Sequence, residues 1–253
     1  KEKPDVVFHF AAYGAYPRIQ GNRETMVKSN INGNINLIDA SLASAGVSVI
    51  TGSSSEYGNV PAPMAEDGPT NPTILYGATK LFTTHYGRMR AREEGKKLIN
   101  IRPFSVYGPY EEPFRLVPYL LSSAILGRKL TLTSPRNVRD YIFIADFFDA
   151  VNLLVEKSGG IAPGEIFNIG SGRETSIRGL VEMVEKSVAK KKLEISWGKG
   201  AAQPEPEHWY ADTEKIGKMG FMPKYSMEAG LRETLSWIKK NMNYYQGVRD
   251  NGN

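Results

Sequence analysis

The chain has 253 residues, 41% of them hydrophobic and 10% aromatic, so it can bury the core of one large domain or of a domain with a smaller lobe. It has no cysteine and three scattered histidines, which excludes disulfides and cysteine nucleophiles, and we expect no metal site. No apolar run approaches the roughly 18 residues that cross a bilayer, and the N-terminus is charged. We therefore expect a soluble, cytoplasmic protein with no membrane partner.

The formal net charge is +5, with 32 Lys and Arg against 27 Asp and Glu. The basic residues are dispersed, and their densest run, residues 190–192, is most simply a solvated helix end. We therefore expect no nucleic-acid partner.

Residues 5–11 form a short, nearly continuous apolar run, which predicts a strand buried on both faces of a parallel sheet. Residues 23–45 then repeat apolar side chains at helical spacing. The next expected elements are a strand at 47–51, a helix at 74–94 ended by Gly95, and a strand at 98–102. Alternating strands and helices of this length predict an α/β fold with a doubly wound parallel sheet.

Beyond residue 102 the expected elements are shorter. They are helices at 115–126, 145–156, 176–190, 212–218 and 227–240, and strands at 129–133 and 165–169. We therefore divide the chain into a core at 1–105, a smaller mixed α/β lobe at 106–240 that returns in part to the core, and a frayed tail at 241–253.

A dinucleotide-binding sheet normally opens with a strand, a glycine-rich turn and a helix whose N-terminus holds the pyrophosphate. No such opening precedes the strand that begins at Asp5. Either the chain omits a segment of its parent protein, or the natural protein lacks it. We favour omission, because a parallel sheet cut at its centre exposes apolar faces and an unpaired edge.

Tyr76 and Lys80 are four residues apart in the expected helix 74–94, so their side chains leave the same face one turn apart. Chance alone gives roughly one such pair in a chain of this composition, so the neighbouring motifs must show whether this pair marks an active site. The serine run 53–55 follows the expected strand 47–51, at the strand end where doubly wound sheets bind ligands. A serine run alone is more simply a turn cap, but with the tyrosine and lysine it indicates an active site.

Five motifs resemble, in order, those of the extended short-chain dehydrogenase/reductases, the NAD-dependent epimerase/dehydratase family. They are residues 8–12, 30–33, 53–58, 102–109, and 139–143 with Asp146. The resemblance spans nearly the whole chain and implies a Rossmann-like sheet whose first half is missing here, followed by a substrate lobe. It also implies NAD or NADP as cofactor and a UDP-, dTDP-, CDP- or GDP-hexose as substrate. A homodimer formed through helices 23–45 and 74–94 is implied too.

The resemblance makes Tyr76 the general acid/base, Lys80 its electrostatic helper and ribose ligand, and Ser53 the hydroxyl that holds the reacting sugar oxygen. A free tyrosine has a pKa of about 10, so a phenolate near neutral pH needs positive charge beside it. Tyr76 would take the sugar hydroxyl proton while hydride leaves the same carbon for the cofactor, giving a keto-sugar.

The family pattern also implies a wider set of contacts. The expected cofactor contacts are Phe10, Ala11, Ala12, Asn30, Thr51, Tyr76, Lys80 and Phe104, and the expected substrate contacts are Ser53, Ser54, Ser105 and Arg139. For the apolar residues the alternative is ordinary core. For Arg139, whose guanidinium suits phosphates, the alternative is an ion pair with Asp140. Gln203 and Pro204 stand where an arginine often grips the nucleotide.

The residues after Ser53 bear on the reaction. Family 4,6-dehydratases follow the catalytic Thr with an Asp-Glu pair, whereas this chain has Ser54 and Ser55, and hydroxyls are poor bases for a carbon-bound proton. Glu56 is one residue out of register, and on a strand-like turn it would face the other way. We therefore expect a 4-epimerase of an NDP-hexose, with two alternatives: a 4-ketoreductase of an NDP-4-keto-6-deoxyhexose, or a non-catalytic nucleotide-binding or regulatory protein.

Overall fold

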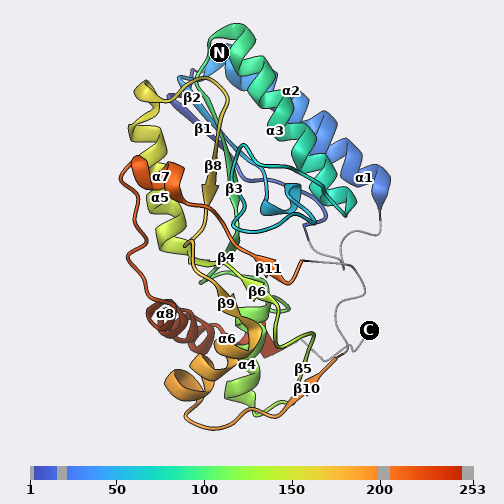
Figure 1. Ribbon diagram of the computed structural model, residues 1–253, viewed down its shortest axis with the longest axis vertical. Helices are drawn as coiled ribbons and strands as arrows, with labels where there is room; N and C mark the ends of the chain where they lie inside the picture. The colour runs from blue at the N-terminus through green and yellow to red at the C-terminus, as the bar shows by residue number, and fades with distance from the viewer. Residues whose placement is uncertain (1–2, 16–21, 199–205, 247–253) are drawn as a thin grey trace.

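The computed structural model describes residues 3–15, 22–198 and 206–246 (Figure 1). The strands are β1 (Val6–His9), β2 (Val47–Thr51), β3 (Leu98–Pro103), β4 (Ser105–Tyr107), β5 (Leu130–Leu132), β6 (Val138–Arg139), β7 (Tyr141–Phe143), β8 (Glu165–Ile169), β9 (Thr175–Ser176), β10 (Ile195–Trp197) and β11 (His208–Trp209). The helices are α1 (Arg23–Val27), η2 (Lys28–Asn32), α2 (Gly33–Ser44), η3 (Ser54–Glu56), α3 (Leu75–Glu94), α4 (Leu116–Leu126), α5 (Ile144–Glu156), η4 (Ser158–Gly160), α6 (Ile177–Val184), η5 (Glu185–Ala189), α7 (Glu214–Lys218), α8 (Met227–Lys240) and α9 (Met242–Gln246).

The central sheet is parallel, with the order β1-β2-β3-β8, and Val49 lies between Phe8 of β1 and Ile99 of β3. Helices α2 and α3 cover one face, where Ile38, Ile50 and Leu98 pack together, and α5 covers the other (Figure 1). Strands β2 and β3 are buried because they have a strand on each side and helices on both faces. The predicted α/β class with a parallel sheet is confirmed.

Strand β1 differs from its prediction. Among the described residues it pairs only with β2, so it lies at an edge, and the Phe8 side chain is 45% exposed. Phe8 stacks on Phe10 with ring centroids 6.0 Å apart, and Phe10 meets Phe148 of α5 edge-on. The expectation that this strand is buried on both faces is therefore wrong, because among the described residues β1 has a neighbouring strand on one side only and Phe8 stays partly exposed.

The two long helices follow the predicted ranges, with one interruption. The chain from α1 to α2 passes through a π-helical turn, η2, in which the Asn30 carbonyl accepts hydrogen bonds from Asn34 Nδ2 and from Thr83 Oγ1 of α3, both at 2.8 Å. The turn thus ties α2 to α3. Helix α3 ends at Gly95, whose φ of 62° is the left-handed conformation that favours glycine.

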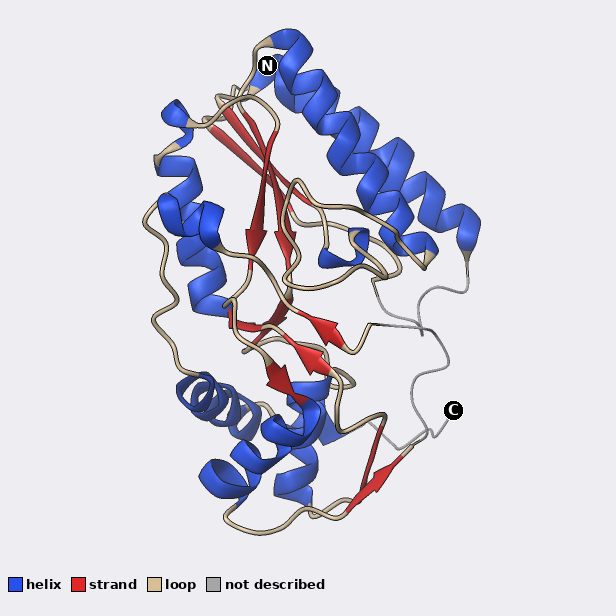
Figure 2. Cartoon of the chain, in the orientation of Figure 1, coloured by secondary structure: helices blue, strands red, loops and turns tan. Residues whose placement is uncertain are grey.

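The second lobe contains α4, α6 and α8 around a core that includes Leu120, Leu180 and Leu231 (Figure 2). Its strands form the small sheets β4-β7, β5-β10 and β11-β6-β9. Of these strands only β5 was predicted, within the expected strand 129–133. The others have only two or three residues, and such runs are too short to show a periodicity.

Residues 242–246, expected within a frayed tail, form helix α9 instead. The Tyr245 ring is fully buried, and its hydroxyl donates to the Glu111 carbonyl at 3.2 Å. Arg128 donates to the Gln246 carbonyl at 2.9 Å. Aromatic anchoring onto α4 and its preceding loop, rather than a repeating apolar face, holds this segment.

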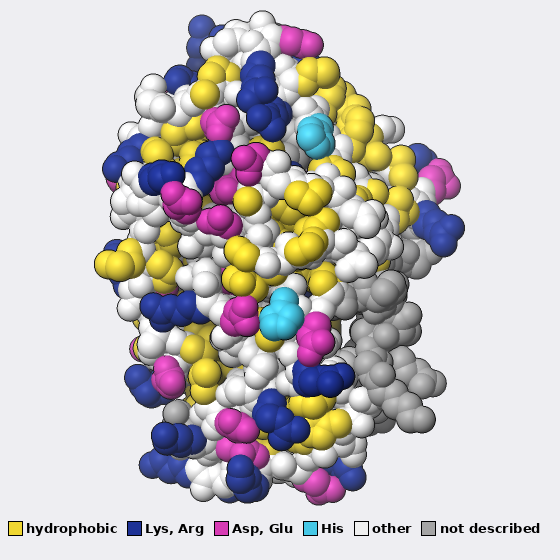
Figure 3. Space-filling model, in the orientation of Figure 1, with side chains coloured by type: hydrophobic (Ala, Val, Ile, Leu, Met, Phe, Trp, Pro, Cys, Tyr) yellow, Lys and Arg dark blue, Asp and Glu magenta, His cyan; other side chains and the backbone are white. Residues whose placement is uncertain are grey.

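The parallel strands point their carboxyl ends towards the second lobe (Figure 2). At this junction β2 runs into η3, and β3 runs into β4. On the face drawn in Figure 3, Lys and Arg side chains alternate with Asp and Glu over both lobes. None of the described helices combines the length and apolar composition that crossing a membrane requires.

Gly58, just after η3, offers a test of how tightly this junction is packed. Its φ is 61°, and a Cβ there would lie 1.8 Å from the Asn71 carbonyl oxygen. We expect Gly58→Ala to lower the free energy of unfolding by roughly 2–4 kcal/mol, from left-handed strain plus a backbone clash. Gly159→Ala, where a Cβ would meet nothing within 4 Å, is the control. Equal losses in urea unfolding would contradict this packing.

Candidate active site

Ser53 caps the short helix η3 at the carboxyl end of β2. Its backbone N–H donates to Glu56 Oε1 at 2.8 Å, and its Oγ accepts from the Ser55 N–H at 3.1 Å. These reciprocal bonds form a capping box. Because Oγ is the acceptor in this contact, the hydroxyl proton is left for another acceptor.

Tyr76 and Lys80 occupy the first turns of α3, beside the serine turn. The Lys80 Nζ lies 6.0 Å from the Tyr76 ring centroid and donates to the Thr51 carbonyl at 2.6 Å, two residues before Ser53. The helix approaches closely at Gly77, where a Cβ would lie 2.3 Å from the carbonyl oxygen of Ser55. The structure thus brings the turn, the tyrosine and the lysine to one end of the sheet.

The Lys80 side chain is only 1% exposed. Burial lowers the pKa of its ammonium from the ordinary 10.5 to about 8, and the Glu56 carboxylate acts in the opposite direction. Burial, and then the positive charge of Lys80, lower the pKa of His9 on β1. The site therefore combines a buried cation with a histidine that favours its neutral form.

Four of the expected cofactor contacts lie in the segment after β1 or on the turn η2. Phe10, Ala11 and Ala12 lie exposed in the segment after β1. Asn30 is buried and anchors that segment, accepting from the Tyr13 N–H at 2.9 Å and donating to the Tyr13 carbonyl at 2.8 Å. The Asn30 amide also donates to Thr79 Oγ1 at 3.2 Å, so it holds the loop against α3.

Two further expected cofactor contacts are Thr51, the last residue of β2, and Phe104, which lies between β3 and β4. Thr51 Oγ1 is buried without a hydrogen-bond partner among the described residues, which is rare and suits a polar ligand or a water. Phe104 is buried, and its ring centroid lies 6.2 Å from that of Tyr57. Phe104 is therefore part of the packing that supports the turn, the alternative foreseen for the apolar contacts.

Two of the expected substrate contacts lie on short strands of different small sheets, Ser105 on β4 and Arg139 on β6. The Ser105 N–H donates to the Asp140 carbonyl at 2.9 Å. The guanidinium of Arg139 lies 5.5 Å from the Trp209 ring centroid, and Nη1 donates to the Val138 carbonyl at 2.8 Å. The Asp140 carboxylate accepts from the Ser171 and Gly172 N–H groups and shapes that turn.

Ser54 is half-buried as the first residue of η3. Gln203 and Pro204 lie outside the described residues.

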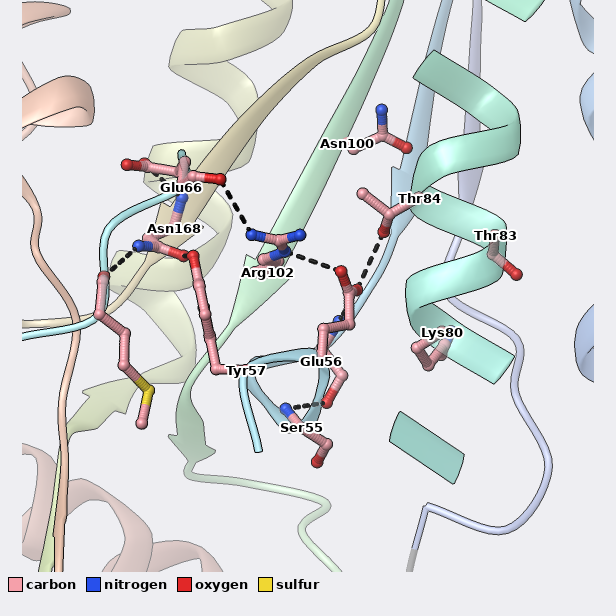
Figure 4. A network of polar contacts seen from close by, with 12 residues as sticks. Ser55, Glu56, Tyr57, Glu66, Lys80, Thr83, Thr84, Asn100, Arg102 and Asn168 are labelled. Atoms are coloured by element: carbon pink, nitrogen blue, oxygen red, sulfur yellow. Dashed lines mark hydrogen bonds and ion pairs between the residues drawn. The ribbon is translucent and has the colours of Figure 1, made fainter. Parts of the chain in front are cut away.

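A buried ion pair that we did not anticipate lies beneath the serine turn (Figure 4). Arg102 Nε donates to Glu56 Oε2 at 2.7 Å, and the two side chains are 1% and 0% exposed. Thr84 of α3 donates to Glu56 Oε1 at 2.9 Å. The turn is 3₁₀-helical rather than strand-like, so the Glu56 carboxylate points inward. An arginine within the apolar strand β3 was the available signal, because a buried guanidinium requires an anion.

The network extends from this pair to the next strand. The guanidinium of Arg102 lies 4.6 Å from the Tyr57 ring centroid, and the Tyr57 hydroxyl donates to Asn168 Oδ1 at 2.7 Å. Asn168 is the neighbour of Arg102 across the β3-β8 pairing. Arg102 Nη1 also donates to the Glu66 carbonyl at 3.2 Å. The turn is thus fixed to the centre of the sheet.

Comparison with known proteins identifies the class to which these features belong. The model of the NAD dependent epimerase/dehydratase family matches residues 1–170. The chain is 34% identical over 255 residues to a UDP-glucose 4-epimerase of Mycolicibacterium smegmatis, covering 94% of this chain and 77% of the relative. It is 28% identical over 253 residues to a dTDP-glucose 4,6-dehydratase of Streptomyces niveus, covering 97% and 73%.

Solved structures agree with these relatives. The UDP-glucose 4-epimerase of Thermotoga maritima, with UDP-glucose, matches with a TM-score of 0.86 and 27% identity over 94% of this chain and 78% of that one. The UDP-glucuronic acid 4-epimerase of Bacillus cereus, with UDP-glucuronic acid and NAD, matches with a TM-score of 0.86 and 26% identity over 94% and 76%. Similar proteins therefore include both epimerases and dehydratases.

The burial of Lys80 generates a stability prediction. Its pKa of about 8 in the folded protein, against 10.5 ordinarily, disfavours the folded ammonium form by roughly 3 kcal/mol. Lys80→Met removes this penalty and loses one hydrogen bond of about 1 kcal/mol. We expect the variant to gain about 1–2 kcal/mol at pH 7.

The same pKa values predict how the stability difference between the wild-type protein and Lys80→Met changes with pH. Between pH 8 and 10.5 the unfolded wild-type chain binds more protons than the folded one, so wild-type stability rises with pH and the advantage of Lys80→Met shrinks. Urea unfolding at pH 7, 9 and 10 measures the difference. Lys157→Met is the control, because Lys157 is exposed although its Nζ also donates to a carbonyl. A pH-independent difference for Lys80→Met would count against the buried charge.

Proposed function

The chain belongs to the NAD-dependent epimerase/dehydratase family, and from this premise we propose that it is a nucleotide-sugar 4-epimerase. It would oxidise C4 of an NDP-hexose and re-reduce the 4-keto sugar from the opposite face. Similar proteins that act on UDP-sugars at C4 support this choice.

The observation that carries the proposal is the lack of an available carboxylate on the serine turn. Elimination of water from a 4-keto sugar requires a base for a carbon-bound proton. Ser54 and Ser55 offer only hydroxyls, and the Glu56 carboxylate is fully buried and bound by Arg102, Thr84 and the Ser53 N–H. This favours epimerisation over dehydration.

The residues at the carboxyl end of β2 fit the reactive half of NAD. Thr51 offers a buried hydroxyl without a partner among the described residues, and Lys80 offers an ammonium beside the Tyr76 ring. Phe10, Ala11 and Ala12 would line the cofactor from the segment that Asn30 anchors. When bound, NAD would accept a hydride from the sugar and return it.

The catalytic roles are divided among three side chains. Tyr76 would remove the proton from the sugar hydroxyl and later return it. The buried ammonium of Lys80 would stabilise the phenolate, since charges interact strongly away from water. Ser53 would donate its hydroxyl proton to the same sugar oxygen, because its Oγ already accepts from Ser55.

The serine turn and the second lobe would together bind the rest of the nucleotide sugar. Ser54 and Ser105 would contact the sugar, and Arg139 would bind the phosphates of the nucleotide. Arg139 lies on β6, next to β7, and β7 pairs with β4, which begins at Ser105. Ser54 would contact the sugar from η3, Ser105 from the start of β4, and Arg139 would reach the phosphates from β6.

We also propose a homodimer formed through the long helices. The outer face of α3 exposes Leu75, Phe82 and Met89 at a spacing of seven residues, which places them on one side of the helix. The Phe82 ring stacks on Tyr86 one turn later. An apolar stripe of this kind suits packing against the same helix of a second copy.

The reaction is tested with protein expressed from the whole gene and incubated with UDP- and dTDP-hexoses. An equilibrium mixture of C4 epimers without added reductant is expected, because an epimerase regenerates its cofactor in each turnover. Turnover only with a 4-keto sugar and NADPH would instead indicate the ketoreductase. Nucleotide binding without turnover of any donor would indicate the regulatory protein.

Tyr76→Phe tests the acid/base role. We expect nucleotide-sugar binding to persist while turnover falls by at least about a hundredfold, the usual effect of removing a general acid/base. Tyr86→Phe on the same helix is the control, since its hydroxyl contacts only the Asp39 carboxylate among the hydrogen bonds described for it. Near-normal turnover in Tyr76→Phe would remove Tyr76 from the mechanism.

A further inference from the structure

The buried ion pair beneath the serine turn has contacts that the proposed reaction does not yet use. Glu56 Oε1 accepts from two donors, the Ser53 N–H and the Thr84 hydroxyl, while Oε2 accepts from Arg102. The carboxylate therefore joins a candidate catalytic residue to α3 and β3. Its three donors fix its position, and Figure 4 shows it between Arg102 and Thr84.

One consequence concerns the Ser53 hydroxyl. The carboxylate of Glu56 holds the backbone of Ser53, and the same turn presents the Ser55 N–H to Ser53 Oγ. If the carboxylate were lost, the capping box would open and the hydroxyl could rotate. Fixing a hydroxyl in advance of binding is how such sites lower a reaction barrier.

A second consequence concerns Lys80. Groups that can carry charge near its ammonium are Glu56 from η3, His9 from β1, Tyr76 on the same helix and Arg102 behind Glu56. Thr84, which donates to Glu56 Oε1, lies one turn beyond Lys80 on the same face of α3. Lys80 donates to the Thr51 carbonyl, two residues before Ser53, whose N–H donates to the same carboxylate oxygen. Burial opposes the charged form of this lysine, and the nearby Glu56 carboxylate favours it. A lysine that must remain an ammonium in an apolar site needs such an anion.

Stability alone does not account for the pair. A buried ion pair is often replaceable by apolar side chains of similar volume without loss of stability, so its presence is weak evidence for a stabilising role. What apolar replacements could not supply is an acceptor for the Ser53 N–H and a negative charge near Lys80.

We propose that Glu56 is a positioning residue of the active site: held by Arg102, its carboxylate fixes the Ser53 hydroxyl and keeps Lys80 in its ammonium form. The part of this inference that concerns turnover rests on the proposed function. Its effect on Lys80 can be measured without cofactor or substrate. Arg102 acts one step further back, by holding the carboxylate in place.

The test is an NMR titration of protein carrying lysine labelled with ¹³C at Cε, with the Lys80 signal assigned from Lys80→Met. In Glu56→Gln we expect the Lys80 midpoint to fall by about one pH unit or more, because an opposing charge has been removed. Glu66→Gln is the matched control, since Glu66 belongs to the same network and accepts from the Asn168 N–H, yet is not among the groups acting on Lys80. In Glu66→Gln the Lys80 midpoint should stay within about a few tenths of a pH unit of the wild-type value.

A second variant covers the case in which Glu56→Gln does not fold, because it leaves Arg102 as a buried, uncompensated charge. Glu56→Gln combined with Arg102→Met removes both charges and should still lower the Lys80 midpoint. An unchanged midpoint in a folded variant of either kind, or an equal shift in Glu66→Gln, would overturn the charge role.

Kinetics test the link to Ser53. A glutamine amide could still accept from the Ser53 N–H, so this test uses Glu56→Met made together with Arg102→Met, which removes the acceptor as well as both charges. We expect this change to lower kcat more than it changes KM, and to move the high-pH limb of kcat to lower pH together with the Lys80 midpoint. In a Ser53→Ala background the same change should reduce kcat by a smaller factor. Equal factors in both backgrounds would overturn the action through Ser53. A failure of the proposed epimerase reaction would leave the titration result intact, so the two failures are distinguishable.

Discussion

The buried ammonium of Lys80 is the constraint on which the rest of the site depends. A cation removed from water needs hydrogen-bond acceptors and negative charge nearby. The Thr51 carbonyl supplies an acceptor, and Glu56 supplies the charge. Glu56 in turn is compensated by Arg102, so the requirements of one lysine propagate from α3 through the serine turn to the centre of the sheet.

The fold supports this arrangement because it brings the carboxyl ends of several strands, and the loops that follow them, to one edge of the sheet. Parallel strands share a carboxyl edge, which puts the turn after β2 beside the crossing from β3 to β4. The π-helical turn η2 places Asn30 where its amide holds the loop after β1 and its carbonyl accepts from Thr83. These contacts gather the candidate residues at one end of the sheet, where the proposed reaction would take place.

Much of the core could be predicted from the sequence, because its strands and helices are long enough to show a period. Helix α3 and its Gly95 cap, β2 and β8 lie where the pattern placed them. The strands of two and three residues in the second lobe carry no period. The exposure of β1 depends on what lies beside it, which its own apolar run does not encode.

The same limit applies to the candidate site. Tyr76, Lys80 and Ser53 were suggested by local spacing and by family resemblance, and the structure places their segments together. Glu56 was judged from a strand-like register, but the capping box turns the backbone into a 3₁₀ helix, and the partner that receives the carboxylate is Arg102, 46 residues later. Sequence spacing does not reveal such a pairing.

The most direct test of this account is a crystal structure of the enzyme with NAD and an unreactive UDP-hexose analogue. We expect Ser53 Oγ and the Tyr76 hydroxyl to contact the same sugar oxygen, the one on C4, with Lys80 directed at the cofactor ribose. A sugar bound away from the serine turn, or Ser53 and Tyr76 directed at different groups, would contradict it.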